Sequence, residues 1–239
     1  MKYTITFFEA DYDKLLGHFS YRSDVEGAAY LLCRMAQMPS EIRLLVREII
    51  PVESAEILEA SSHHMRISSS SYTRSFKRAD DLKSCFIFSH SHPDDHPFHS
   101  GQDDAEESKL FATAYTRIHT PGAVHGSLIF TSKGISGARV WLEDGTTASI
   151  DCIRIIGNQF RFWFPDHSVF QVPEFFDRQV RAFGSDVQKL LGRLTIGIVG
   201  AGGTGSCVAE QIIRLGVNSV IISDGQTFES SNANRVYGS

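Results

Sequence analysis

The chain has 239 residues, of which 42% are hydrophobic and 21% charged, and a formal net charge of −5. These values are typical of a globular protein, and the lack of a basic block argues against a nucleic-acid-binding surface. No run is long enough to cross a bilayer, and charged residues interrupt the start MKYTITFFEADYDKLL, which is not the pattern of a signal peptide. The four cysteines lack C-x-x-C spacing, so we expect reduced thiols and a cytoplasmic location.

The first part of the chain predicts helices alternating with strands. A short helix is expected over residues 11–22, followed by two buried strands, EGAAYLLC (26–33) and IRLLVREIIPV (42–52). A helix with charged residues on one side is expected over 71–85, leading into the strand CFIFSHSH. The next helix, over 105–118, opens with acidic residues, which suit a helix N-terminus.

Short strand-like runs separated by glycine and polar turns follow: VHGSLIFT, ARVWLED, CIRIIG and FRFWF. Residues 165–175 contain two prolines and have the composition of a linker. The pattern then changes to a helix over 177–192, the strand LTIGIVG, a glycine turn, the helix CVAEQIIRLG and the strand SVIISD, which together form a βαβ unit. We therefore predict an α/β protein with a boundary near residue 165, giving the domains 1–165 and 166–239.

Metal-binding side chains are concentrated at the end of the strand CFIFSHSH. His90 and His92 would point to one face of a strand, because side chains alternate with a period of two. The spacing H-S-H-x7-S-x2-D then adds Ser100 and Asp103, and a returning loop would bring Asp103 to the same ion. Two nitrogens, one carboxylate oxygen and a water describe a catalytic zinc site, although two polar residues at a strand end also explain H-x-H alone. The other polar residues of this loop are expected to form a solvated face: Asp94, Asp95, His96 and His99.

The pair of strings HSHP and SGQD at this spacing resembles the signature of the JAMM/MPN family of zinc isopeptidases. The resemblance covers about residues 1–165 and implies a mixed β-sheet flanked by helices, with cleavage after the C-terminal glycine of ubiquitin or a ubiquitin-like protein. It also implies an upstream glutamate as general acid/base, for which Glu26 in EGAAYLL fits better than Glu9. Ser100 is implied as a donor to the oxyanion, although a helix N-cap explains its hydroxyl nearly as well.

A second motif follows the strand LTIGIVG, where glycines form a G-x-G-x-x-G turn before a helix. Glycines let the backbone approach phosphates, and the helix N-terminus stabilises their charge. The bare pattern suggests a dinucleotide enzyme. The longer string GAGGTGS, the carboxylate at the end of the next strand, the string SNANR and the upstream DRQ together resemble the ThiF/MoeB family, which includes ubiquitin-activating enzymes.

By this resemblance Asp224 holds the ribose of ATP, Asn232 and Arg235 contact the phosphates, and Arg178 reaches the nucleotide of a partner subunit, which implies a homodimer. The glycines of the loop are Gly200, Gly202, Gly203 and Gly205. One departure is visible, since Gln226 stands where the family has a second acidic residue. The lysine, the magnesium-binding aspartate and the catalytic cysteine of the family would lie further on, so ATP and Mg²⁺ belong to a complete activating domain, the first βαβ unit of a Rossmann-like fold.

The string SNANRVYGS stops inside a motif. We therefore expect the chain to be part of a longer protein, and the alternative is a vestigial second domain.

Both resemblances point to one substrate class. We expect a Zn²⁺-dependent peptidase that processes or deconjugates a ubiquitin-like protein. It would be fused to an ATP-dependent adenylyltransferase that activates the C-terminus of the same protein. The expected setting is a bacterial conjugation system or antiviral defence against phage. A conjugating enzyme is a further expected partner, and neither nucleic acid nor a membrane is. The rival interpretations are a peptidase that processes a sulfur carrier in cofactor or cysteine synthesis, and a metal-free MPN scaffold that only binds a partner. The intact ligand set speaks against the scaffold.

Overall fold

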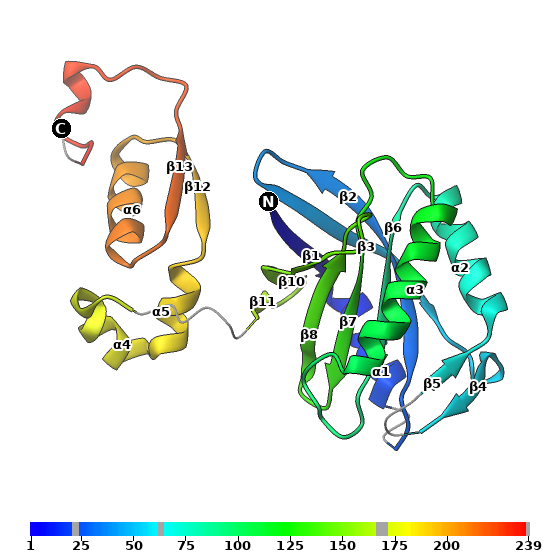
Figure 1. The fold of residues 1–239 in the computed structure, drawn as a ribbon. Helices are drawn as coiled ribbons and strands as arrows, with labels where there is room; N and C mark the ends of the chain where they lie inside the picture. Colours follow the sequence, from blue (N-terminus) through cyan, green and yellow to red (C-terminus); the bar gives the residue numbers. More distant parts are fainter. Residues whose placement is uncertain (21–23, 62–64, 166–171, 238–239) are drawn as a thin grey trace. The chain divides into compact units, whose positions relative to one another are not determined.

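The computed structural model describes residues 1–20, 24–61, 65–165 and 172–237. The chain forms two compact units, Met1–His167 (unit 1) and Ser168–Ser239 (unit 2), whose elements are labelled in Figure 1. No helix within the described ranges has the length and apolar character needed to cross a membrane.

A mixed sheet of nine strands, counted over the described residues, forms the centre of unit 1 in the order β11-β10-β1-β3-β2-β6-β7-β8-β9. Strand β1 is parallel to β3 and β10, and β6 is parallel to β7, whereas the other neighbours are antiparallel. Its strands are β1 (Lys2–Phe8), β2 (Ala28–Gln37), β3 (Glu41–Pro51), β6 (Cys85–Ser91), β7 (His125–Thr131), β8 (Gly134–Trp141), β9 (Thr147–Ser149), β10 (Cys152–Ile156) and β11 (Arg161–Trp163).

Helices cover both faces of this sheet. Helix α1 (Glu9–Ser20) lies on one face, and α2 (Ser69–Asp81) and α3 (Gly101–Arg117) lie on the other (Figure 1). A turn of 3-10 helix, η1 (Ser54–Glu56), precedes a small hairpin of β4 (Ile57–Ala60) and β5 (Met65–Ile67) beside α2.

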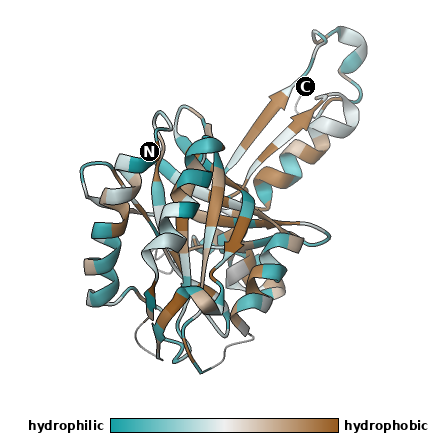
Figure 2. Cartoon of the chain, turned by 90° about the vertical axis from the view of Figure 1, so that its right-hand side faces the viewer, coloured by the Kyte–Doolittle hydropathy of each residue, from teal (hydrophilic) through white to brown (hydrophobic). Residues whose placement is uncertain are grey.

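The run AAYLLC in β2 explains why both faces are covered. Ala29, Leu31 and Cys33 belong to the core under α1, while Ala28, Tyr30 and Leu32 belong to the core under α2 and α3. A strand buried on both faces is apolar at successive positions rather than at alternate ones. Figure 2 shows hydrophobic residues concentrated on the strands, whereas the helices carry both hydrophilic and hydrophobic residues. The predicted strand over 26–33 therefore exists, but it begins at Ala28, so Glu26 precedes it.

Unit 2 contains a parallel pair, β12 (Thr195–Val199) and β13 (Ser219–Ser223), joined by helix α6 (Gly203–Arg214). This is the βαβ unit that the sequence predicts. The single helix predicted over 177–192 is wrong, because α4 (Asp177–Phe183) ends at Gly184, whose φ of +88° a helix does not accept, and α5 (Ser185–Leu191) starts after it. Two turns of 3-10 helix complete the unit, η2 (Glu174–Phe176) and η3 (Ser230–Asn232).

Candidate metal centre

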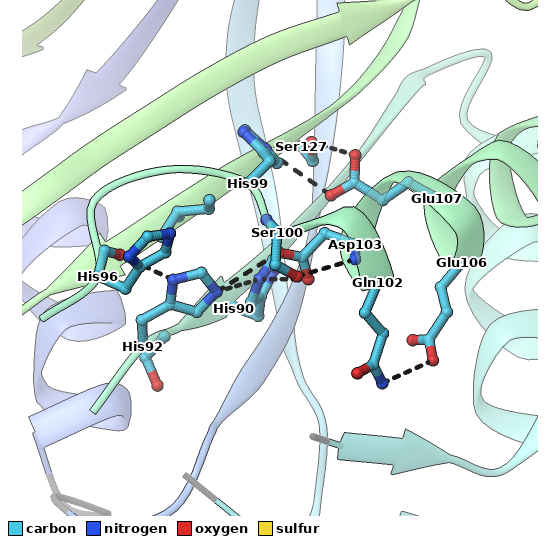
Figure 3. Close-up of polar contacts among 12 residues, drawn as sticks. His90, His92, His96, His99, Ser100, Gln102, Asp103, Glu106, Glu107 and Ser127 are labelled. Carbon is cyan, nitrogen blue, oxygen red and sulfur yellow. Dashed lines mark hydrogen bonds and ion pairs between the residues drawn. The ribbon is translucent and has the colours of Figure 1, made fainter. Parts of the chain in front are cut away.

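His90, His92 and Asp103 each bring one ligand atom to within 4.8 Å of the others. The Nε2 atoms of the two imidazoles are 3.0 Å apart, and the carboxylate oxygens of Asp103 lie 3.3 Å from His90 Nε2 and 3.7 Å from His92 Nε2. Figure 3 shows the three side chains converging between the end of β6 and the start of α3. Two imidazole nitrogens and a carboxylate oxygen are a usual zinc ligand set.

The local structure explains how these residues meet. His90 lies in β6 with its ring stacked on Phe88, on the face covered by α2 and α3. Strand β6 ends at Ser91, so His92 lies one residue past the strand rather than within it. Asp103 is the third residue of α3 and closes a capping box with Ser100: the Ser100 hydroxyl accepts from the Asp103 N–H, and Asp103 accepts from the Ser100 N–H.

The hydrogen bonds define how the cluster is protonated. The Nδ1 of His92 lies 2.8 Å from the carbonyl oxygen of His96, and a carbonyl only accepts, so Nδ1 carries a proton and Nε2 turns its lone pair to the cluster. Burial and the neighbouring His90 lower the pKa of His92, which favours this neutral form. Burial opposes the charge of Asp103, but the contacts with His90 and Ser100 hold its pKa well below the usual range. The Nε2 lone pair of His92 and the Asp103 carboxylate both lie at His90 Nε2, and a donor set of two imidazoles and a carboxylate fits a metal ion.

Glu26, the predicted acid/base, lies two residues before Ala28, the residue of β2 that pairs with His90. Its side chain is buried, and its backbone N–H donates to the Ser61 carbonyl at 3.1 Å. Burial raises the pKa of Glu26 to about 7, and the charge of His90 opposes this shift while that of Asp103 adds to it. A carboxyl group that titrates near neutral pH suits proton transfer in both directions.

Glu9, the rival glutamate, is occupied elsewhere. Its carboxylate accepts from the Asn158 N–H at 2.8 Å and lies 3.4 Å from the guanidinium of Arg161. The predicted choice of Glu26 over Glu9 thus agrees with these contacts.

The loop between the ligands differs in part from its predicted solvated face. Asp94, Asp95 and His96 are exposed as expected, although Asp95 accepts from the N–H and hydroxyl of Ser132 at 2.7 and 2.6 Å. For His99 the prediction is wrong, because its ring lies only 12% exposed and its Nε2 is 2.9 Å from the Ser127 hydroxyl. Burial and the neighbouring Arg139 lower the pKa of His99 to about 2, so the ring is neutral.

A buried carboxylate behind the cluster was not predicted from the sequence. Glu107 follows Asp103 by four residues on α3, and its Oε2 accepts three hydrogen bonds, from Ser127 Oγ at 2.7 Å, Arg139 Nε at 2.9 Å and Trp141 Nε1 at 2.8 Å. Burial raises the pKa of Glu107, and Arg139 opposes that shift. The sequence did carry a signal, because residues four apart share one face of a helix and Asp103 was already assigned.

A groove leads away from the cluster between α2 and α3. It has a volume of about 740 Å³, and β5 also contributes to its wall through Met65, Arg66 and Ile67. Asp103 is one of its lining residues, and the lining also includes the aromatic and apolar side chains Tyr72, Phe76, Phe88 and Leu110.

The glycine loop of unit 2 has the backbone that its sequence requires. Gly200 has a φ of +90°, and a Cβ on Gly205 would lie 1.8 Å from the Gly200 carbonyl oxygen, so both positions need glycine. Asp224 accepts from the Ala201 N–H at 2.6 Å, which places its carboxylate at the loop and lowers its pKa.

The other residues predicted to bind the nucleotide have the following positions and contacts in unit 2. Gly202 is the N-cap of α6, and Gly203 faces the backbone of Arg235. Asn232 uses its side-chain oxygen to accept from the Glu229 N–H at 2.8 Å. Arg178 lies exposed on α4.

Comparison with known proteins bears on unit 2. The model of the ThiF family matches residues 176–238, in agreement with the resemblance predicted for this segment. No curated protein matches the chain. Among solved structures, the solution structure of a protein from Desulfitobacterium hafniense is similar over 70% of this chain and 99% of that chain, with 16% sequence identity and a TM-score of 0.42. The JAMM/MPN resemblance of residues 1–165 stays a prediction.

Proposed function

We propose that unit 1 is a zinc-dependent peptidase of the JAMM/MPN type, which cleaves after the C-terminus of a ubiquitin-like protein. The observation that carries this proposal is the convergence of His90, His92 and Asp103 within 4.8 Å. Glu26 is buried and lies two residues before the pairing partner of His90. These three residues would hold the ion, whose Lewis acidity lowers the pKa of water toward neutrality.

The protein's own residues then move protons and stabilise charge. Glu26, with a pKa raised to about 7 by burial, takes a proton from the attacking water and returns it to the leaving amine. The Ser100 oxygen accepts a hydrogen bond from the Asp103 N–H. The hydroxyl proton of Ser100 can therefore be donated to the oxyanion. A C–O bond forms and the amide C–N bond breaks, so the reaction consumes water and no nucleotide.

The substrate class rests on the ThiF match of residues 176–238. A domain that activates a ubiquitin-like C-terminus with ATP and Mg²⁺, and a peptidase that exposes or releases the same C-terminus, would act on one partner. In the complete activating domain the glycine loop and Asp224 would hold ATP, with Asn232 and Arg235 at the phosphates and Arg178 reaching across a homodimer. A conjugation system, including one in antiphage defence, is the favoured setting. Processing of a sulfur carrier is the second candidate, because the same match suits it.

The test combines metal analysis with cleavage. The purified protein is incubated without ATP with a ubiquitin-like protein extended by a short C-terminal peptide, and with the same protein linked to a lysine side chain. We expect about one zinc per chain and a product that ends at the terminal glycine. Cleavage of the lysine-linked substrate supports deconjugation, whereas cleavage of the linear extension alone supports sulfur-carrier processing.

The matched variant is His92→Ala, which removes one ligand that lies past the end of β6. Zinc content and cleavage should both fall. Equal, stoichiometric zinc in the wild type and in His92→Ala contradicts the ligand assignment. A folded wild-type protein that does not bind zinc and does not cleave the substrate supports the metal-free MPN scaffold instead.

A further inference from the structure

The burial of His99 is a feature that the proposed peptidase does not use. Its side chain is only 12% exposed, although Phe98, the residue before it, is 57% exposed. The Nε2 atom of His99 lies 2.9 Å from Ser127 Oγ and 3.8 Å from Glu107 Oε1. Figure 3 shows the ring beside these two side chains. His99 is therefore the point at which the loop of residues 93–99 is attached to the sheet before α3 begins.

The direction of this hydrogen bond follows from the groups around Glu107. Arg139 Nε and Trp141 Nε1 can only donate, and both end on Glu107 Oε2, at 2.9 and 2.8 Å. The Ser127 hydroxyl donates its single proton to the same oxygen at 2.7 Å. The Ser127 oxygen can then only accept from His99, so Nε2 of His99 carries the ring proton.

The same loop packs directly on the backbone of β8. A Cβ on Gly137 would lie 3.2 Å from the Pro97 carbonyl oxygen and 3.4 Å from His99 Cε1. Glycine allows such a close approach of two chain segments, because it has no side chain to displace the neighbour. The ring of His99 is therefore held by two strands, β7 through Ser127 and β8 through Gly137.

The next residue is Ser100, the proposed donor to the oxyanion. The capping box with Asp103 fixes Ser100 relative to α3, whereas His90 lies on β6, in the sheet. His99 fixes the chain relative to that sheet, because Ser127 lies on β7, the parallel neighbour of β6. An oxyanion donor acts only within hydrogen-bond reach, and a displacement of about 1 Å can lower the rate by about 10²-fold.

We propose that His99 is a positioning residue of the peptidase: its hydrogen bond to Ser127 fixes Ser100 against the sheet, so that the Ser100 hydroxyl reaches the oxyanion. This inference rests on the proposed function. His99 acts only through Ser100.

The first half of the loop has a separate attachment. Asp95 accepts from the N–H and hydroxyl of Ser132 at 2.7 and 2.6 Å, and the next residue, His96, accepts from His92 Nδ1 through its carbonyl oxygen at 2.8 Å. The orientation of His92 therefore depends on the attachment at Asp95. Loss of the His99 contact should leave zinc bound and affect the rate alone.

The test compares His99→Leu with His99→Gln. The two replacements are uncharged and similar in size, but only glutamine has an N–H donor near the position of Nε2. For His99→Leu we expect kcat to fall by about 10- to 100-fold, with unchanged zinc content and KM within about twofold of the wild type. His99→Gln should recover most of kcat. A wild-type kcat in His99→Leu, or equal losses in both variants, overturns the inference.

A double-variant cycle tests whether His99 acts through Ser100. Ser100→Ala alone should lower kcat by about 10²- to 10³-fold. Adding His99→Leu to Ser100→Ala should lower kcat by less than about twofold more, because the hydroxyl that His99 positions is already absent. A purely structural role of His99 would instead make the two losses multiply, and that result contradicts the inference.

One measurement needs no variant that disturbs the fold. Two-bond ¹H–¹⁵N spectra of the wild type with labelled histidines report the tautomer of each ring, and we expect the proton of His99 on Nε2. A proton on Nδ1 overturns the inference even if His99→Leu does not fold. A wild type that does not cleave contradicts the proposed function, and the inference with it. A wild type that cleaves but gives any of the contrary results above contradicts the inference alone.

Discussion

Acidification should destabilise unit 1 through one buried histidine, His125. The ring is fully buried, its Nδ1 accepts from the Phe86 N–H at 3.0 Å, and the Tyr115 ring packs edge-on against it with centroids 4.5 Å apart. Burial lowers the pKa of His125 from 6.5 to about 4. The unfolded chain therefore binds more protons than the folded protein between these two values. Stability is fully present above about pH 6.5 and is lost as the pH falls.

The magnitude follows from the difference between the two pKa values. Each pKa unit corresponds to about 1.4 kcal/mol, so the full loss is about 3 kcal/mol, reached only below about pH 4. About 2 kcal/mol of this should already be lost by pH 5. For a domain whose free energy of unfolding is about 5–15 kcal/mol, such a loss is easily measured.

The assay is urea unfolding from pH 8 to pH 5, in the presence of a chelator so that metal binding does not contribute. The matched variant is His125→Asn, whose side-chain oxygen can take the place of Nδ1 as acceptor for Phe86 but does not titrate. Other groups, including His99, also respond to acid, and the difference between wild type and variant cancels them. That difference should change by about 2 kcal/mol over this range. Parallel curves for the two proteins would refute the reasoning.

Three other outcomes are expected. Glu26→Gln should retain zinc yet lose cleavage by about 10²-fold or more, because the general acid/base is missing. Glu9→Gln should cleave as the wild type does. The reverse pattern in a cleavage assay would identify Glu9 as the base. A zinc chelator should abolish cleavage, and omission of ATP should not, as followed by mass spectrometry of the products; dependence on ATP would contradict the hydrolytic mechanism. Phe111→Ala should lower the free energy of unfolding in urea by about 3–5 kcal/mol. The reason is that Phe111 is 1% exposed and packs on Phe86 and Trp141. A loss under about 1 kcal/mol would show that neighbouring side chains fill the cavity.

Local patterns in the sequence were sufficient to predict several of the helices and strands of this protein. The apolar run of β2 and the βαβ unit around GAGGTGS follow from side-chain periodicity and glycine geometry, which act over a few residues. The helix predicted over 105–118 exists, but α3 starts four residues earlier, at Gly101. The spacing from His90 to Asp103 likewise predicted that these residues meet, and the structure brings them within 4.8 Å. That they bind zinc stays a prediction.

Tertiary structure alone decided the rest, because the deciding contacts join distant parts of the chain. Strand β1 pairs with β10 about 150 positions later, and no local pattern specifies such a partner. For the choice between Glu26 and Glu9 the sequence context already favoured Glu26, and the fold adds the contacts of Glu9 with Asn158 and Arg161. His99 was predicted to lie on a solvated face, and no role was predicted for Glu107. In the fold, β7 supplies Ser127 as a partner for both side chains, and β8 supplies Arg139 and Trp141 as further partners for Glu107. A buried polar group needs such partners, and only the packed sheet provides them.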